Sequence, residues 1–192
     1  MVRLSISRRL GTTTAVTVAA AALAAYQLRR GVFQILDTAS YESGVRSILD
    51  GHPFTSTLAP SFSPFDAIEF LDRGGRIPFV DFPIGLPVVA AALAWIIGSR
   101  AALGVVAVIA VAAFAAITVW GPTPNRTPTG SWVRAIAALG ICAMPTMRLV
   151  VQGGLSEPLF CALVVALAAE VVRTLDDEER PLTVALLLGA TI

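Results

Sequence analysis

The chain has 192 residues, 56% of them hydrophobic, and a mean hydropathy of +0.77. This composition excludes an ordinary soluble domain and predicts an all-α integral membrane protein, a multi-span helical bundle in the plasma membrane. The formal net charge is only +1, so nothing suggests a nucleic-acid partner. All 14 basic residues are arginine, which favours a GC-rich, bacterial genome.

The first apolar segment is residues 11–28, and Arg3, Arg8 and Arg9 precede it. Its 18 residues are near the minimum for a transmembrane helix. A cleaved secretory signal peptide is the alternative, because it has the same basic start and apolar core. We favour an uncleaved span because the later segments are also apolar. Under either interpretation the residues that follow lie outside the cytoplasm.

Residues 29–82 form a polar stretch between apolar segments, and we predict that they are an extracytoplasmic loop. Residues 31–87 hold seven of the thirteen acidic residues of the chain. Ordering so long a loop between membrane spans is costly, so we expect it to have a functional role.

The first half of this loop predicts a helix over residues 37–50. Its apolar side chains share one face at helical spacing: Tyr41, Val45, Ile48 and Leu49. Asp37 stands at the start, where a carboxylate caps free N–H groups and meets the positive end of the helix dipole. Gly51 and Pro53 follow the last apolar position and predict the end of the helix.

A second short helix is predicted over residues 63–73. Ser63 is suited to the N-cap, Pro64 to the first helical position, and Asp66 completes a capping box. Gly74 then ends the helix. Two short amphipathic helices beside a hydrophobic domain are expected to lie at the membrane surface.

Five hydrophobic segments follow the loop: 83–97, 101–120, 132–151, 156–172 and 182–192. Segment 101–120 has no charged residue and is the clearest span, whereas 132–151 is interrupted by Pro145 and Arg148. The last segment covers about half a bilayer crossing, which would leave backbone carbonyls unsatisfied in lipid. We therefore expect residues 1–192 to be a single transmembrane domain, the N-terminal part of a longer protein.

Two topologies are open, because segment 83–97 is short and contains two prolines. If it crosses the membrane, Glu157 is cytoplasmic. If it is re-entrant or interfacial, Glu157 lies outside with Asp37. The second topology also places four arginines inside: Arg126, Arg134, Arg173 and Arg180. The positive-inside rule favours it.

The two cysteines, Cys142 and Cys161, both lie in apolar runs. We expect them to act as small hydrophobic side chains in helices. With one histidine in the chain and no paired cysteine spacing, no metal site is predicted.

Three sequence runs carry a family resemblance beside Asp37: Leu49-Asp50-Gly51-His52-Pro53, Asp81-Phe82-Pro83-Ile84-Gly85-Leu86-Pro87 and Ser156-Glu157-Pro158-Leu159-Phe160. With a first span before them, they resemble the membrane glycosyltransferases of the GT-C type. That group includes protein O-mannosyltransferases, aminoarabinose transferases, and actinobacterial arabinosyl- and mannosyltransferases. The resemblance covers most of the chain as a loose pattern. Family members commonly carry Asp-Glu at the start of the loop, where this chain has Asp37-Thr38.

The resemblance implies transfer of a sugar from a polyprenyl-phosphate donor to a hydroxyl acceptor outside the cytoplasm. Membrane lipid and the lipid-linked donor would be the partners, and the use of a divalent metal stays open. Asp37 matches the family's catalytic aspartate and would act as the base that deprotonates the acceptor. The residues alone favour a helix cap for Asp37.

Glu157 is the second catalytic candidate, because an acid at the edge of a span is costly to bury and is often functional. Its alternative role is a first-turn acid favoured by the helix dipole. Arg46, Arg76 and Arg148 are candidates for binding the donor phosphate, since guanidinium groups suit phosphate oxygens. The alternative for each arginine is a solvated or snorkelling side chain.

A function of a different class is a non-catalytic polytopic membrane protein, either transporter-like or an assembly subunit. A transporter is expected to place polar groups at mid-membrane in broken helices. Pro145 and Arg148 are such a signal, but the acidic residues gather in the loop. The sequence therefore favours chemistry at the membrane surface.

Overall fold

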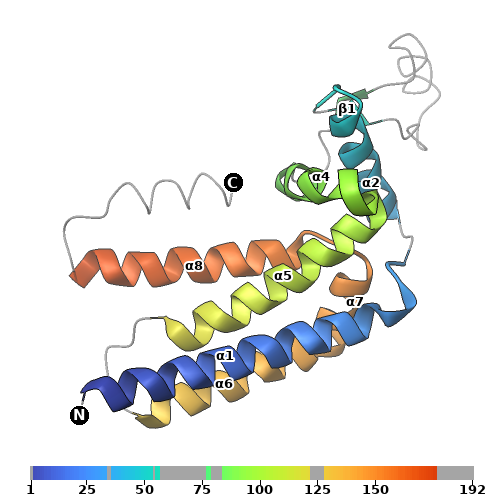
Figure 1. The fold of residues 1–192 in the computed structure, drawn as a ribbon. Coiled ribbons are helices and arrows are strands. Elements are labelled where there is room, and N and C mark those ends of the chain that lie inside the picture. Colours follow the sequence, from blue (N-terminus) through green and yellow to red (C-terminus); the bar gives the residue numbers. More distant parts are fainter. Residues whose placement is uncertain are drawn as a thin grey trace. The chain divides into compact units, whose positions relative to one another are not determined.

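The computed structural model describes residues 2–33, 36–53, 55–56, 77–78, 84–121 and 128–176, and it is mostly helical (Figure 1). Its α-helices are α1 (Val2–Gln27), α2 (Leu36–Leu49), α4 (Gly85–Ile97), α5 (Ser99–Trp120), α6 (Pro128–Ala143), α7 (Pro145–Gln152) and α8 (Glu157–Asp176). A short 3-10 helix, η1 (Leu28–Arg30), follows α1. The expected all-α class is thus confirmed. A two-residue antiparallel ladder of β1 (Thr55–Ser56) and β2 (Ile77–Pro78), which the sequence did not predict, accompanies the helices.

The chain divides into two compact units. The bundle unit consists of Met1–Arg29, Ala107–Val151 and Glu157–Ile192. The α2 unit consists of Arg30–Val106 and Gln152–Ser156. Helix α5 begins in the α2 unit and ends in the bundle unit.

Small side chains form the core of the bundle unit, where α1 packs against α6. Alanine is the commonest residue of this core, and it allows helix backbones to approach closely. Cys142 is buried in the same core, as expected for a small hydrophobic side chain. The side chain of Gln27, on α1, donates a hydrogen bond of 3.3 Å from Nε2 to the carbonyl of Cys142 on α6. A side-chain amide thus adds a polar contact to an otherwise apolar helix pair.

Among the described residues, α5 is the one unbroken helix that is long and apolar enough to cross a membrane. Trp132–Ala143 and α7 would form a second candidate span if the two helices cross the membrane together. The angle between these two helices is 58°. The bend falls at Pro145, as the sequence predicted, because proline has no N–H to donate and its ring crowds the preceding turn. Helix α4 has 13 residues, so its length of about 20 Å is less than the hydrocarbon thickness of about 30 Å. The multi-span bundle stays a prediction.

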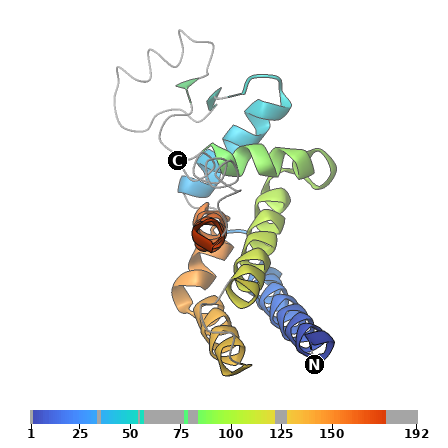
Figure 2. The same cartoon turned by 90° about the vertical axis from the view of Figure 1, so that its left-hand side faces the viewer.

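In the α2 unit, α2 packs against α4, and the two helices cross in both views (Figures 1 and 2). The predicted helix 37–50 is confirmed to within one residue. At its end Gly51 has φ of 77°, and its N–H and that of His52 bond back to the carbonyls of Ile48 and Ser47. This is the hydrogen-bond pattern that commonly ends a helix at glycine. The predicted helix 63–73 and the last hydrophobic segment, 182–192, lie outside the described residues.

Segment 152–156, which joins α7 to α8, belongs to the α2 unit. The N–H of Phe33 donates a hydrogen bond of 2.7 Å to the carbonyl of Gln152. Gly154 has φ of +58°, and a Cβ at this position would lie 3.1 Å from Val32 Cγ1 and 3.3 Å from Leu103 Cβ. The segment therefore needs a glycine here, both for its backbone conformation and for its close packing.

We predict that Gly154→Ala lowers the stability of the protein by about 1–2 kcal/mol from the left-handed backbone conformation alone. Crowding against Val32 and Leu103 adds to this cost. Two matched substitutions separate the causes. Gly51→Ala has the same backbone problem in open space, and Gly140→Ala lies within α6 in open space, where alanine is the better helix former. Thermal unfolding in detergent, followed by tryptophan fluorescence, should rank Gly140→Ala most stable and Gly154→Ala least. Equal midpoints for all three variants would contradict this packing.

Candidate functional site

The buried face of α2 is polar, which the apolar pattern of its sequence did not indicate. Tyr41 and Val45 are buried as predicted, but Leu49 is 43% exposed. Five polar residues of the helix are buried: Thr38, Ser40, Glu42, Ser43 and Ser47. The predicted apolar face is therefore only partly buried, and polar side chains make up much of the contact surface of α2. The local sequence pattern predicts which face of the helix is apolar. It does not predict the hydrogen bonds to residues distant in sequence that determine how α2 packs.

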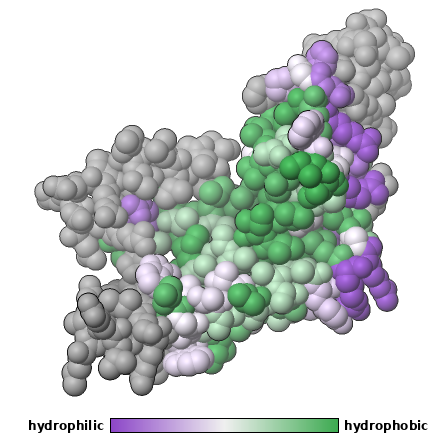
Figure 3. Space-filling model, viewed as in Figure 1, coloured by the Kyte–Doolittle hydropathy of each residue, from purple (hydrophilic) through white to green (hydrophobic). Residues whose placement is uncertain are grey.

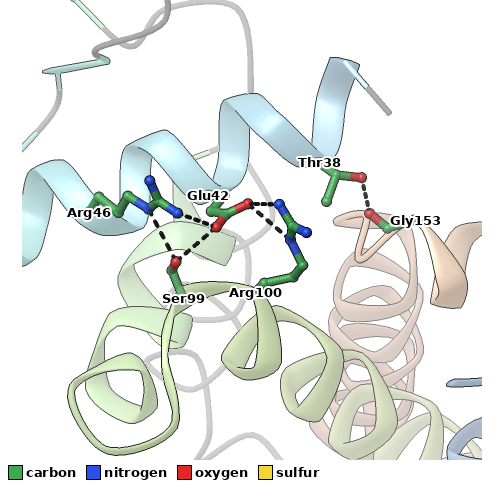
Figure 4. A network of polar contacts seen from close by, with 6 residues as sticks. All are labelled: Thr38, Glu42, Arg46, Ser99, Arg100 and Gly153. Atoms are coloured by element: carbon green, nitrogen blue, oxygen red, sulfur yellow. Dashed lines mark hydrogen bonds and ion pairs between the residues drawn. The ribbon is translucent and has the colours of Figure 1, made fainter. Parts of the chain in front are cut away.

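Side-chain hydrogen bonds hold the first half of α2 against segment 152–156. The hydroxyl of Thr38, which is fully buried, donates to the carbonyl of Gly153 (Figure 4). The hydroxyl of Tyr41 donates to Ser156 Oγ at 2.9 Å. Partners in both pairs are 115 residues apart in the sequence. Tyr41, which was predicted to lie on the apolar face, thus also positions the helix through this hydrogen bond.

Glu42 is the centre of a network of charged groups in the α2 unit (Figure 4). Its carboxylate is 9% exposed and accepts hydrogen bonds from two guanidinium groups. Arg100 donates to Oε2 from Nε at 3.2 Å and from Nη2 at 2.9 Å, and Arg46 donates to Oε1 from Nη2 at 2.6 Å. The hydroxyl of Ser99 donates to Oε1 at 3.2 Å. Because Ser99 and Arg100 begin α5, this network fixes α2 to the corner between α4 and α5.

The ionised form of Glu42 is favoured despite its surroundings. Burial by itself raises the pKa of this carboxyl group. The hydrogen bond and charge of Arg100, together with the charge and hydrogen bond of Arg46, outweigh burial and leave the pKa below its ordinary value. The carboxylate is therefore charged at neutral pH and serves as the anionic partner of both arginines.

Asp37, the predicted catalytic residue, is the second residue of α2 and is partly exposed. Its carboxylate makes no hydrogen bond or ion pair with any other residue that the structure describes. Asp37 lies in the first turn of α2, where its negative charge interacts favourably with the positive end of the helix dipole. Tyr41 follows four residues later and therefore shares its helix face.

The structure does not bring Arg46 to Asp37. They are nine residues apart on α2, which is a rotation of about 180° around the helix axis. Arg46 lies with Glu42, so its observed role is that of an ion-pair partner. Arg148 is exposed on α7, in the bundle unit, and Arg76 lies outside the described residues.

Glu157 is exposed in the first turn of α8, which belongs to the bundle unit. It directly follows Ser156, the residue that accepts the hydrogen bond of Tyr41. The bundle unit also contains an apolar cavity of about 510 Å³, lined by Leu10, Thr13, Trp120 and Glu170 among others. The charged network of Glu42 and the hydrogen bonds of Thr38 and Tyr41 are all in the α2 unit, so the candidate site is placed there.

Sequence reasoning missed Glu42, Ser99 and Arg100. The pair Glu42 and Arg46 had a detectable signal, since a spacing of i, i+4 on a predicted helix favours an ion pair. Arg100 is 58 residues from Glu42, and nothing in the local pattern connects the two. No group of three or more His, Cys, Asp or Glu side chains capable of holding a metal ion occurs within the described part of the chain.

Comparisons with family models, with curated proteins and with solved structures found no match to this chain.

We predict that Glu42→Gln destabilises the protein by about 1–3 kcal/mol, because two arginines lose their charged acceptor at a buried position. Arg46→Gln should cost less, at most about 1 kcal/mol, since the Arg46 side chain is 64% exposed and its ion pair is screened by solvent. Denaturant unfolding in detergent measures both changes.

The pH dependence gives a second test of the same network. A carboxyl group with a lowered pKa adds stability that is complete above its unfolded value of about 4.5. That stability is lost as the pH falls through the lower, folded-state pKa. The difference between wild type and Glu42→Gln should therefore be constant from neutral pH to about 5 and shrink below 4.5. A difference that grows on acidification would contradict the ion-pair assignment.

Proposed function

We propose that this chain belongs to a multi-pass membrane glycosyltransferase that takes a sugar from a polyprenyl-phosphate donor. The acceptor is a hydroxyl group outside the cytoplasm, and Asp37 is the general base. The proposal joins the resemblance of the sequence to GT-C enzymes with the geometry of α2.

The state of the Asp37 carboxylate is the observation that carries this proposal. The carboxylate is partly exposed and not engaged with other described residues. Three side-chain hydrogen bonds hold the helix that bears it. They join Thr38 to Gly153, Tyr41 to Ser156, and Arg100 to Glu42. A base needs both properties, an open lone pair and a fixed position, because misplacement by a fraction of a hydrogen-bond length lowers the rate.

The proposed reaction is a displacement at the anomeric carbon of the donor sugar. Asp37 accepts the proton of the acceptor hydroxyl while the acceptor oxygen bonds to the anomeric carbon. The bond from that carbon to the phosphate oxygen breaks, and polyprenyl phosphate leaves with the electron pair. Glu157 as a second acid, and Arg76 and Arg148 as phosphate ligands, stay candidates from the sequence alone, whereas Arg46 pairs with Glu42.

The break between α6 and α7 favours one alternative, a transporter-like protein without catalysis. Transporters bind substrates where membrane helices are interrupted, and here the helix bends by 58° at Pro145. This alternative gives Asp37 no chemical role, so replacing Asp37 distinguishes the two functions.

The proposed topology makes its own prediction. If α4 does not cross the membrane and α5 does, then Gly130 lies inside and Gly154 lies outside, on the side of Asp37. Alkaline phosphatase and green fluorescent protein fused at these positions should report an inside location at Gly130 and an outside location at Gly154. The reverse pattern at both sites would reject the topology.

We predict that Asp37→Asn lowers sugar transfer by about 10²–10⁴-fold, since it removes the proton acceptor. The expected cost in stability is at most about 1 kcal/mol, from the loss of one charge near a helix N-terminus. The assay uses the protein from its complete reading frame in liposomes, with polyprenyl-phosphate mannose and polyprenyl-phosphate arabinose, each radiolabelled in the sugar. Release of the label from lipid to an acceptor extract measures transfer.

Asp50→Asn is the matched control, because Asp50 is an exposed acid at the other end of the same helix. It should leave transfer unchanged. Transfer by Asp37→Asn within a few-fold of the control would remove Asp37 from the catalytic role. Absence of transfer by the wild-type protein with either donor would count against this substrate class.

A further inference from the structure

Helix α4 is apolar on all sides, and only one side is covered. Residues 84–99 contain no charged side chain. Five residues at helical spacing are buried: Leu86, Pro87, Ala90, Ala91 and Ala94. A helix that is hydrophobic all round is normally buried in a protein core or in a membrane. The second face of α4 therefore needs an apolar partner.

The uncovered face carries large side chains. Its members follow i, i+4, i+7 and i+8 from Val88: Val88, Ala92, Trp95 and Ile96. Trp95 is 84% exposed and Ile96 is 76% exposed. Figure 3 shows hydrophobic residues gathered over α4 and the adjoining start of α5. This is a continuous apolar surface rather than a scattering of single side chains.

We propose that the face of α4 formed by Val88, Ala92, Trp95 and Ile96 inserts into the interfacial layer of a lipid bilayer, with α4 lying in the membrane plane. The inference concerns the placement of the protein on lipid and does not depend on sugar transfer. Three features of the α2 unit and of α5 select lipid as the occupant.

The length of α4 is the first feature. Thirteen residues span about 20 Å, so the helix is too short to cross the bilayer and is suited to lying along its surface. The second feature is continuity with α5, the helix that is long and apolar enough to span. Gly98, with φ of 83°, is the single residue between α4 and α5, and the chain changes direction there (Figure 2).

The third feature is the chemistry at the end of α4. Trp95 lies near this end, and tryptophan is enriched at the membrane–water interface. The apolar face itself offers no side-chain hydrogen-bonding group other than the Trp95 indole N–H, whereas protein interfaces carry several hydrogen bonds. A second copy of the chain is therefore the less suited occupant.

Tryptophan quenching tests the depth of α4. The protein carries Trp120→Phe and Trp132→Phe, which leaves Trp95 as the only tryptophan among residues 1–192. It is reconstituted into vesicles of phosphatidylcholine and phosphatidylglycerol. The phosphatidylcholine is brominated near the headgroup, at mid-chain or near the chain end. We expect the greatest loss of Trp95 fluorescence with bromine near the headgroup and little loss with aqueous iodide. As a control, a protein with Trp95→Phe and Asp50→Trp in the same background should respond to iodide and not to bromine.

Three outcomes would overturn the proposal. Greatest quenching by bromine near the chain end would place Trp95 at mid-membrane. Quenching by iodide alone would place it in water, and quenching by neither would show that protein covers the face.

A second measurement serves if the tryptophan variants do not assemble. A nitroxide on Ala92→Cys, with Cys142→Ala and Cys161→Ala, should collide more with oxygen than with a water-soluble nickel chelate. A nitroxide on Asp50→Cys should show the opposite preference. Equal preference at the two positions would also reject lipid contact by α4.

Discussion

A carboxylate that is only 9% exposed must be compensated by nearby positive charge, because its desolvation costs several kcal/mol. Glu42 meets this requirement with Arg100 from the start of α5 and Arg46 from its own helix. Since Arg100 is remote in sequence, compensation by both arginines requires α2 to lie against the α4–α5 corner. Any other packing of α2 that buried Glu42 without Arg100 would leave the carboxylate poorly compensated and would be disfavoured. The ion pair therefore selects this packing, even where its net contribution to stability is small.

The attachments of α2 lie on one side of the helix. Thr38 is three residues from Tyr41 and four from Glu42, so the three side chains are neighbours on the helix surface. They bind three separate points, which are the Gly153 carbonyl, Ser156 and the start of α5. Three points of attachment restrict the rotation of the helix as well as its translation. Asp37, which makes none of these bonds itself, thereby acquires a defined position while its carboxylate remains open.

Prediction from sequence succeeded where the cause was local. Helix α2 was located to within one residue because Gly51 and the apolar period mark it, and the break at Pro145 followed from the missing N–H of proline. It failed where the cause was distant. The partner of Thr38 is a backbone carbonyl 115 residues away, and a carbonyl has no residue type that a pattern could reveal. Likewise, Arg100 lies between two apolar segments, and nothing in the local sequence indicates that its side chain binds Glu42, 58 residues away.

Helical geometry also divides the candidate residues of α2 between chemistry and structure. Asp37 and Arg46 both carry charge and lie on one short helix, so the sequence allowed them to share a site. A separation of nine residues places them on opposite sides of the axis, and Arg46 there meets the buried Glu42. An arginine that neutralises a buried carboxylate has less positive potential to offer a phosphate. Asp37, at the start of α2, is therefore the charged residue of this helix that stays available for chemistry, and Arg46 acts as an ion-pair partner of Glu42.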